Sequence, residues 1–400
     1  MHLALDFLAL LSSRGGGMLL SALGGLLWVR LLSAPAFGAY SLATTTLGLV
    51  GVLADFGLDP ILTRELSAQR GGVSLLRRAI SLRLGVGVAL ILGMVILAAL
   101  TTTFGRADLL LIGGLGLLPR GAMRAYAAAL IGLGKARQVG QLEGFTQIFI
   151  SVLTVAFTLI SVAHGHEGAA AIMAALGLGH GFGLLLLWRA WRRHRQTDNL
   201  TNFSLNALLR AAVGFTLIAA FSAAFHAVDS YAVQALYGER ALALYAAPFR
   251  LLNLIIIVPT VWGVIVLPRY VALMSDQAAF RVRLQRDVLL WLLISVPLSA
   301  LPITFADVIT PAVLGAAYAP SVPILIVQCG MVLPICAATP LLAALTVHNR
   351  QAYVAVGVIT GVLLLVIGNI LWAGNGVIAV AALRVAITAL LTVFYALALR

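Results

Sequence analysis

The chain has 400 residues, of which 62% are hydrophobic and 10% are charged, and its mean hydropathy is +1.07. Soluble domains are roughly 45–50% apolar and about 25% charged, so this composition excludes a soluble globular protein and indicates a polytopic membrane protein. The net charge of +13 comes from 26 basic and 13 acidic residues. The basic residues gather in short loops between apolar runs, which indicates membrane topology and argues against a nucleic-acid partner.

Apolar segments long enough to cross a bilayer follow one another along the whole chain. A transmembrane helix needs about 20 mostly apolar residues. The predicted spans are 14–32, 40–59, 79–103, 109–133, 140–162, 168–188, 205–236, 241–267, 288–305, 322–347, 352–372 and 376–399. The sequence therefore predicts an all-α polytopic membrane protein with about twelve transmembrane helices.

The loop arginines predict the orientation of these helices. With the N-terminus in the cytoplasm, the outer loops contain only Arg106 and Arg240, and Arg30 lies near the outer end of the first span. The inner loops and the C-terminus contain Arg64, Arg70, Arg77, Arg78, Lys135, Arg137, Arg189, Arg192, Arg193, Arg195, Arg269, Arg281, Arg283, Arg286, Arg350 and Arg400. This distribution follows the positive-inside rule at every loop, so both termini are predicted to be cytoplasmic.

Blocks of the first half of the chain recur in the second half. Shifts of 205, 215 and 208 residues align, among others, Tyr40 with Tyr245, Arg64 with Arg269, Pro119 with Pro334, and Arg192 with Arg400. We expect two six-helix lobes in the same orientation, 1–200 and 201–400, joined by the basic linker 189–203. Parallel repeats of this kind occur in transporters, where substrate binds between the halves.

Three stretches carry a family resemblance: AFGAYSLA…LADFGLDPILTREL, LYGERALALYAAPFRLLNLIIIVP…VLPRYVAL and LGAAYAPSVPILIVQCGMVLP. They resemble the O-antigen and polysaccharide flippases of the multidrug/oligosaccharidyl-lipid/polysaccharide exporter (MOP) superfamily. The resemblance implies a monomeric flippase in the bacterial inner membrane, which moves an undecaprenyl-diphosphate-linked oligosaccharide to the periplasmic leaflet. Membrane lipids and the polysaccharide polymerase machinery are the other partners that it implies.

Arginines inside the spans are the first candidates for binding a diphosphate. A charge near the bilayer centre costs about 2.5–3.5 kcal/mol on insertion scales, so such residues usually have a function. Arg120 and Arg124 are one turn apart after Pro119, and two guanidinium forks on one helix face could clamp a diphosphate. The alternative is that one of them extends to the membrane surface, as is also expected of Arg83.

Three further arginines are candidates with their own alternatives. Arg250 lies about ten residues inside the eighth span, where an acidic residue such as Asp229 could hold it instead. Arg384 lies in the last span, which could be peripheral. Arg14 precedes the first helix and could guard the inner mouth.

The carboxylates inside the spans are candidates for gating or cation coupling. Asp55 and Asp59 lie toward the cytoplasmic end of the second span, and Asp59, just before Pro60, is expected to mark the end of that helix. We expect an ionic latch between these carboxylates and arginines of the inner gate, with cation coupling or a plain rim position as alternatives.

Two further acidic residues are coupling candidates. Asp229 could couple transport to a cation, or it could form a core pair with Arg250 or Arg240. Glu143 begins a polar stripe along the fifth span that either lines a wet cleft or mediates helix packing.

Two other functions remain open from the sequence: a cation-coupled multidrug exporter and a membrane glycan polymerase or ligase. The excess of intramembrane arginine favours an anionic substrate over organic cations, and no large outer loop is available to hold an acceptor. An enzyme is therefore not expected. No nucleotide motif or metal-site spacing is present, so no cofactor is expected, and Cys329 and Cys336 are interpreted as buried thiols.

Overall fold

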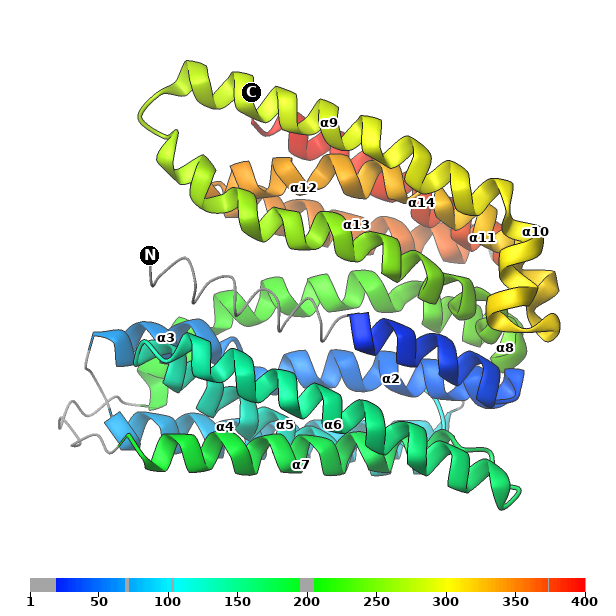
Figure 1. Cartoon of the computed structure of the whole chain (residues 1–400), viewed down its shortest axis with the longest axis horizontal. Coiled ribbons are helices and arrows are strands. Elements are labelled where there is room, and N and C mark those ends of the chain that lie inside the picture. Colours follow the sequence, from blue (N-terminus) through cyan, green and yellow to red (C-terminus); the bar gives the residue numbers. More distant parts are fainter. Residues whose placement is uncertain (1–18, 69–71, 102–103, 195–204, 373, 400) are drawn as a thin grey trace. The chain divides into compact units, whose positions relative to one another are not determined.

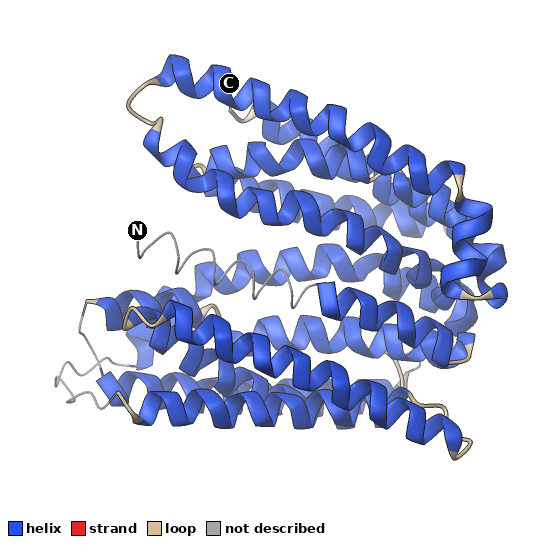
Figure 2. Ribbon diagram, viewed as in Figure 1, coloured by secondary structure: helices blue, strands red, loops and turns tan. Residues whose placement is uncertain are grey.

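The computed structural model describes residues 19–68, 72–101, 104–194, 205–372 and 374–399. All regular structure in these ranges is helical, and they contain no strand (Figure 2). Arg14 lies outside the described residues, so its role at the inner mouth stays a prediction.

The first half of the chain forms a series of long helices joined by short connections. They are an apolar helix Leu19–Leu31, α2 (Ala34–Asp55), α3 (Leu58–Ser67), α4 (Gly72–Leu100), α5 (Ala107–Gly132), α6 (Ala136–Ala163) and α7 (Ala169–Arg192). The second half continues with α8 (Leu205–Ala272), α9 (Gln277–Thr304), α10 (Ala306–Ile309), a π-helical turn Thr310–Leu314, a 3-10 helix Ala316–Ser321, α11 (Val322–Cys329), α12 (Val332–Val347), α13 (Gln351–Leu371) and α14 (Gly376–Leu397).

The long helix α8 contains two membrane spans. Gly238 interrupts it with φ 81° and ψ −178°, a conformation that residues with a Cβ rarely adopt. The break coincides with the predicted connection between the seventh and eighth spans. Because a single helix of 68 residues would be about 100 Å long, the break at Gly238 is what allows the chain to turn back into the bilayer.

The described residues support the predicted fold class. Nine helical segments are long and apolar enough to cross a membrane, and the segment Ala212–Ala272 contains the break at Gly238. The shorter apolar helix Leu19–Leu31 and α5, with 26 residues, complete a set that matches the twelve predicted spans in order. The protein is therefore an all-α, multi-pass membrane protein. Large apolar side chains such as Leu92, Ile96 and Leu293 are exposed, as expected on faces that contact lipid.

The chain divides into two compact units: Leu31–Ala223 belongs to the first, and Ala224–Arg400, together with Gly25–Arg30, belongs to the second. Their boundary falls within α8.

In the first unit α5 packs against α7, α4, α3 and α2 (Figure 1). Gly116 of α5 and Gly177 of α7 meet backbone to backbone, since a Cβ on Gly116 would lie 2.7 Å from the Gly177 Cα. Small residues of this kind let membrane helices approach closely. The consequence is that α5, the span with two central arginines, is surrounded by helices of its own unit.

In the second unit α12 packs against α9 and α14, and α14 also contacts α11 and α13. Cys329 and Cys336 are free thiols buried in one apolar cluster with Leu252, Trp291 and Leu325, which confirms their interpretation as buried thiols. Burial against apolar side chains leaves them without a chemical partner in that cluster.

Candidate functional site

The second predicted span is broken one turn earlier than the sequence suggested. Phe56 and Gly57 adopt the left-handed conformation (φ 50° and 57°), so α2 ends at Asp55 and α3 begins at Leu58. The expectation that Asp59 marks a helix end was wrong, because Asp59 lies in the first turn of α3. Its carboxylate therefore sits at the positive end of a short helix, where the helix dipole favours an anion.

Packing fixes the position of α3 and thus of Asp59. Leu58, Leu62 and Leu66 recur every four residues, and all three are buried in a cluster that includes residues of α5. A Cβ on Gly57 would lie 2.7 Å from the Phe215 Cβ, so the turn before α3 has no room for a side chain. These contacts hold the two aspartates on either side of the break.

Arg124 bridges the two aspartates. Its guanidinium lies 2.9 Å from the Asp55 carboxylate and 2.5 Å from the Asp59 carboxylate, so a cation on α5 joins the end of α2 to the start of α3. Glu143 of α6 adds a further favourable electrostatic interaction with Arg124. Of the predicted site residues, the structure thus brings Asp55, Arg124 and Glu143 together within the first unit.

Arg83 of α4 completes this arrangement, contrary to the expectation that it extends to the membrane surface. Its side chain is 1% exposed, forms an ion pair of 2.5 Å with Asp59, and donates to the Gly121 carbonyl at 3.1 Å. Arg83 was expected at the membrane surface because it lies near the end of a predicted span. The sequence could not show that Asp59 lies opposite it. The partners of Asp55 and Asp59 are thus Arg83 and Arg124 of the same unit, and the role of these ion pairs as a latch stays a prediction.

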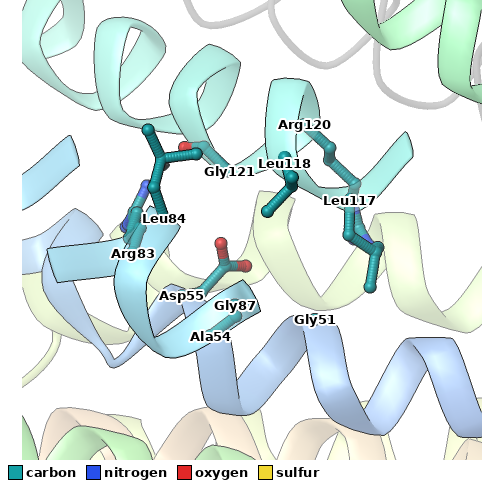
Figure 3. A pocket seen from close by; sticks show the side chains of 10 residues that line it. All are labelled: Gly51, Ala54, Asp55, Arg83, Leu84, Gly87, Leu117, Leu118, Arg120 and Gly121. Carbon is teal, nitrogen blue, oxygen red and sulfur yellow. Dashed lines mark hydrogen bonds between the residues drawn. The ribbon is translucent and has the colours of Figure 1, made fainter. Parts of the chain in front are cut away.

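Arg120 differs from both of these arginines. Within the described part of the chain it forms no direct ion pair and no hydrogen bond, and it interacts electrostatically with Asp55 and Asp59 at longer range. A Cβ on Gly51 would lie 3.1 Å from its Nη1, so the glycine in α2 leaves the space that the guanidinium occupies. Figure 3 shows Arg120 and Arg83 on either side of Asp55, around a cavity of about 10 Å³, which is enough for about one water molecule.

A larger cavity of about 140 Å³ lies on the other side of Arg120. Its wall includes Thr44 of α2 and His180 of α7, together with several glycines. The Thr44 hydroxyl donates to the carbonyls of Tyr40 and Ser41. The sequence analysis did not single out His180. A signal was present, because His180 is the polar residue within the small-residue run GLGHGFG of α7.

A second charged cluster lies in the second unit. Arg384 of α14 is 5% exposed and donates to the Asp229 carboxylate at 3.2 Å and to the Phe225 carbonyl. Its guanidinium also lies 3.0 Å from His226 Nδ1 and 4.0 Å from the centre of the Phe225 ring. The Tyr245 hydroxyl donates to the same Asp229 oxygen at 3.0 Å. Arg384, Asp229 and Tyr245 of this cluster are buried, whereas His226 is exposed.

The partner of Asp229 differs from both alternatives in the sequence analysis. Arg250 and Arg240 were considered, but the ion pair forms with Arg384, which was a candidate for binding substrate. Arg250 lies elsewhere, half-buried beside Gly25, where a Cβ would approach its Cδ to 3.2 Å.

The polar stripe of α6 satisfies much of its own hydrogen bonding. Thr154 and Thr158 are buried, and each hydroxyl donates to the carbonyl four residues before it. This pattern supports helix packing at these two positions. The described residues contain no group of three or more His, Cys, Asp or Glu side chains that could hold a metal ion.

Comparison with solved structures shows which known proteins share the fold. The lipid II flippase MurJ in an inward closed conformation matches with a TM-score of 0.75 and 14% identity, over 96% of this chain and 86% of that chain. An inward-facing multidrug resistance MATE family transporter matches with a TM-score of 0.72 and 14% identity, over 96% of this chain and 93% of that chain.

A MOP superfamily transporter from Pyrococcus furiosus, described by a binding pocket of reverse polarity, matches with a TM-score of 0.68 and 15% identity, over 98% and 94% of the two chains. The fold is therefore that of the MOP superfamily of transporters.

The sequence assigns the chain to a protein family. The model of the family described as polysaccharide biosynthesis protein matches residues 27–323, so the chain belongs to that family. The resemblance predicted from the sequence is confirmed at this level. No curated protein sequence matches the chain.

Proposed function

We propose that the protein is a flippase that moves an undecaprenyl-diphosphate-linked oligosaccharide from the cytoplasmic to the periplasmic leaflet of a bacterial inner membrane by alternating access. The observation that carries the proposal is Arg120, a charged side chain in the middle of a span, which forms no direct ion pair or hydrogen bond with the described residues and interacts with Asp55 and Asp59 only at longer range. A charged side chain inside a membrane span is costly, and the nearby carboxylates already pair directly with Arg83 and Arg124. We therefore expect Arg120 to bind an external anion.

The chemistry of Arg120 fits a phosphate group. A guanidinium stays ionised, and its planar fork matches two phosphate oxygens at once. The cavity of about 140 Å³ beside Arg120 also contains His180 and the Thr44 hydroxyl, both of which could contact phosphate or sugar oxygens. The membership in a polysaccharide biosynthesis family and the fold shared with a lipid II flippase support a lipid-linked glycan as the substrate.

Arg124 has a different part in this proposal. It lies one turn from Arg120 but is held by Asp55 and Asp59, so a diphosphate must compete with two carboxylates for it. We infer that Arg120 makes the first contact and that Arg124 is recruited in the loaded state. Loss of Arg124 from the two aspartates would loosen the connection between α2 and α3 at the break.

The remaining candidates are assigned by their surroundings. Arg250 is retained as a second contact with the substrate, since it lies half-buried on the second half of α8. Arg384 and Asp229 neutralise each other, so we infer that they maintain the second unit and that Asp229 does not take up a coupling cation.

The test uses the purified protein in liposomes. We expect translocation of a polyprenyl-diphosphate oligosaccharide, slower translocation of the corresponding monophosphate, and no extrusion of a cationic dye. The multidrug-exporter alternative predicts the reverse, namely dye extrusion without movement of the lipid-linked glycan. Protein-free liposomes and liposomes that contain the Arg137→Ala variant, in which an exposed arginine at the start of α6 is removed, serve as controls.

A further inference from the structure

A groove on the second unit is separate from every residue of the proposed transport site. It has a volume of about 530 Å³ and is lined by residues of α9, α12 and α14. These helices pack side by side, since α12 contacts both α9 and α14 (Figure 1). The groove is therefore formed within one unit.

One face of α9 provides most of the groove, and its chemistry changes along the helix. The lining residues begin with Arg281 and Gln285 near the start of α9 and continue with Leu289 and Leu292. Their spacing of three or four residues places them on one side of the helix. One end of the groove is thus cationic and polar, and the rest is apolar.

Arg281 is available to a ligand. It is exposed, and the described residues provide it with no ion pair or hydrogen bond. The nearby carboxylate of Asp287 is already occupied, because Arg283 pairs with it at 3.0 Å and the Tyr270 hydroxyl donates to it at 3.1 Å. Among the described residues, this carboxylate is therefore not available to Arg281.

The length and position of the groove match one leaflet. Arg281 and Leu292 are eleven residues apart, or about 16 Å along a helix, and half of a hydrocarbon core of about 30 Å is about 15 Å. The neighbouring basic residues Arg269, Arg283 and Arg286 place this end of α9 at the cytoplasmic surface by the positive-inside rule. Basic pockets between membrane helices on this side can bind anionic lipid head groups.

We propose that this groove, which we call the α9 groove, binds an anionic phospholipid of the cytoplasmic leaflet. The phosphate and the anionic head group contact Arg281 and Gln285, and one acyl chain lies along Leu289 and Leu292 against Leu341 of α12. A glycerophospholipid fits better than the transported lipid, because the apolar part of the groove ends near mid-membrane depth. The inference does not depend on the proposed function.

The test measures binding of single lipids to the purified full chain in detergent, by native mass spectrometry. The probes are dioleoyl phosphatidylglycerol, dioleoyl phosphatidylcholine with the same acyl chains, and a polyprenyl phosphate. We expect phosphatidylglycerol to bind roughly fivefold more tightly than phosphatidylcholine, because one basic side chain near the membrane surface increases the affinity for an anionic lipid by about this factor. Arg281→Gln is expected to remove this preference, and Leu289→Trp to weaken both phospholipids by filling the groove.

A matched variant separates a site from a general charge effect. Arg286 is exposed on the same helix but does not line the groove, so Arg286→Gln should keep the full preference. The proposal is overturned if Arg281→Gln keeps the preference, or if Arg286→Gln removes it to the same extent. It is also overturned if the polyprenyl phosphate occupies the site and phosphatidylglycerol does not displace it. Because Arg281 and Arg286 are both exposed, neither variant is expected to unfold, and thermal stability in detergent verifies this.

Discussion

The two charged clusters of this protein, one in each unit, use arginine in opposite ways. In the second unit Arg384 and Asp229 are both almost fully buried, and aromatic and carbonyl groups complete their surroundings. In the first unit Arg83 and Arg124 pair with Asp55 and Asp59, while Arg120 lies beside two cavities and forms no direct ion pair with the described residues. The comparison shows that the fold compensates arginines inside the spans in different ways: Arg384 has a direct ion pair, whereas Arg120 interacts with carboxylates only at longer range.

The largest expected effect on stability concerns the ion pair between Arg384 and Asp229 in the second unit. Arg384→Met should lower the free energy of unfolding by about 3–5 kcal/mol, because it leaves the buried Asp229 carboxylate without its cation. Denaturant titration of the purified protein in detergent measures this loss. The double variant Arg384→Met/Asp229→Leu should recover most of it, since both charges are then absent. A loss below about 1 kcal/mol in the single variant would show that water screens the pair.

A smaller loss of stability is expected for Arg83→Gln in the first unit. The substitution removes the ion pair with Asp59, but Arg124 still compensates that carboxylate, so we expect about 1.5–3 kcal/mol. The same titration measures it. Arg77→Gln, on the exposed side of α4, is the matched control and should stay within about 0.5 kcal/mol of the parent protein. Equal effects of the two substitutions would contradict the buried position of Arg83.

The third prediction changes the position of Arg120 without removing it. Gly51→Ala places a methyl group 3.1 Å from the guanidinium, which must then move. Loss of one charge-assisted hydrogen bond would weaken substrate binding by up to about tenfold, with little change in stability. Binding of the lipid-linked substrate to the detergent-solubilised protein gives the value. Gly85→Ala, where a Cβ meets no atom within 4 Å, is the control and should bind normally. If both variants bind normally, Arg120 does not contact the substrate in this position.

The smallest effect is expected at the surface. Arg106, before α5, pairs with Asp108 at 2.8 Å and with Glu167 at 2.6 Å, and these carboxylates raise the pKa of its guanidinium above the ordinary value. All three side chains are at least 42% exposed, so Arg106→Ala should cost less than about 1 kcal/mol. The difference should disappear in 1 M salt, where such pairs are screened. A larger, salt-independent loss would show that the connection is more buried than the structure places it.

The sequence predicted the helices well, because apolar length and loop arginines are local properties. Twelve spans, the turn at Gly238 and the central positions of Arg120 and Arg124 follow from the residues themselves. The break at Phe56 and Gly57 was not predicted, because Phe56 rarely adopts a left-handed conformation and nothing local requires it there.

The pairing of charges could not be derived from one sequence. Asp59 contacts Arg83 from 24 residues away and Arg124 from 65, and Asp229 contacts Arg384 from 155. The sequence did not show which carboxylate each arginine pairs with, since the choice of partner depends on which helices pack together. Only the packed structure separates Arg120 from the others.

The most direct test of the account is the rate of translocation of a polyprenyl-diphosphate oligosaccharide by Arg120→Ala in liposomes, at matched protein density. We expect the rate to fall at least about tenfold, because the variant loses a charge-assisted hydrogen bond to the substrate. The free energy of unfolding should stay unchanged or rise. Arg120→Lys should be intermediate, because it keeps the charge but loses the fork. A folded Arg120→Ala protein that translocates this lipid at the parent rate would contradict the account.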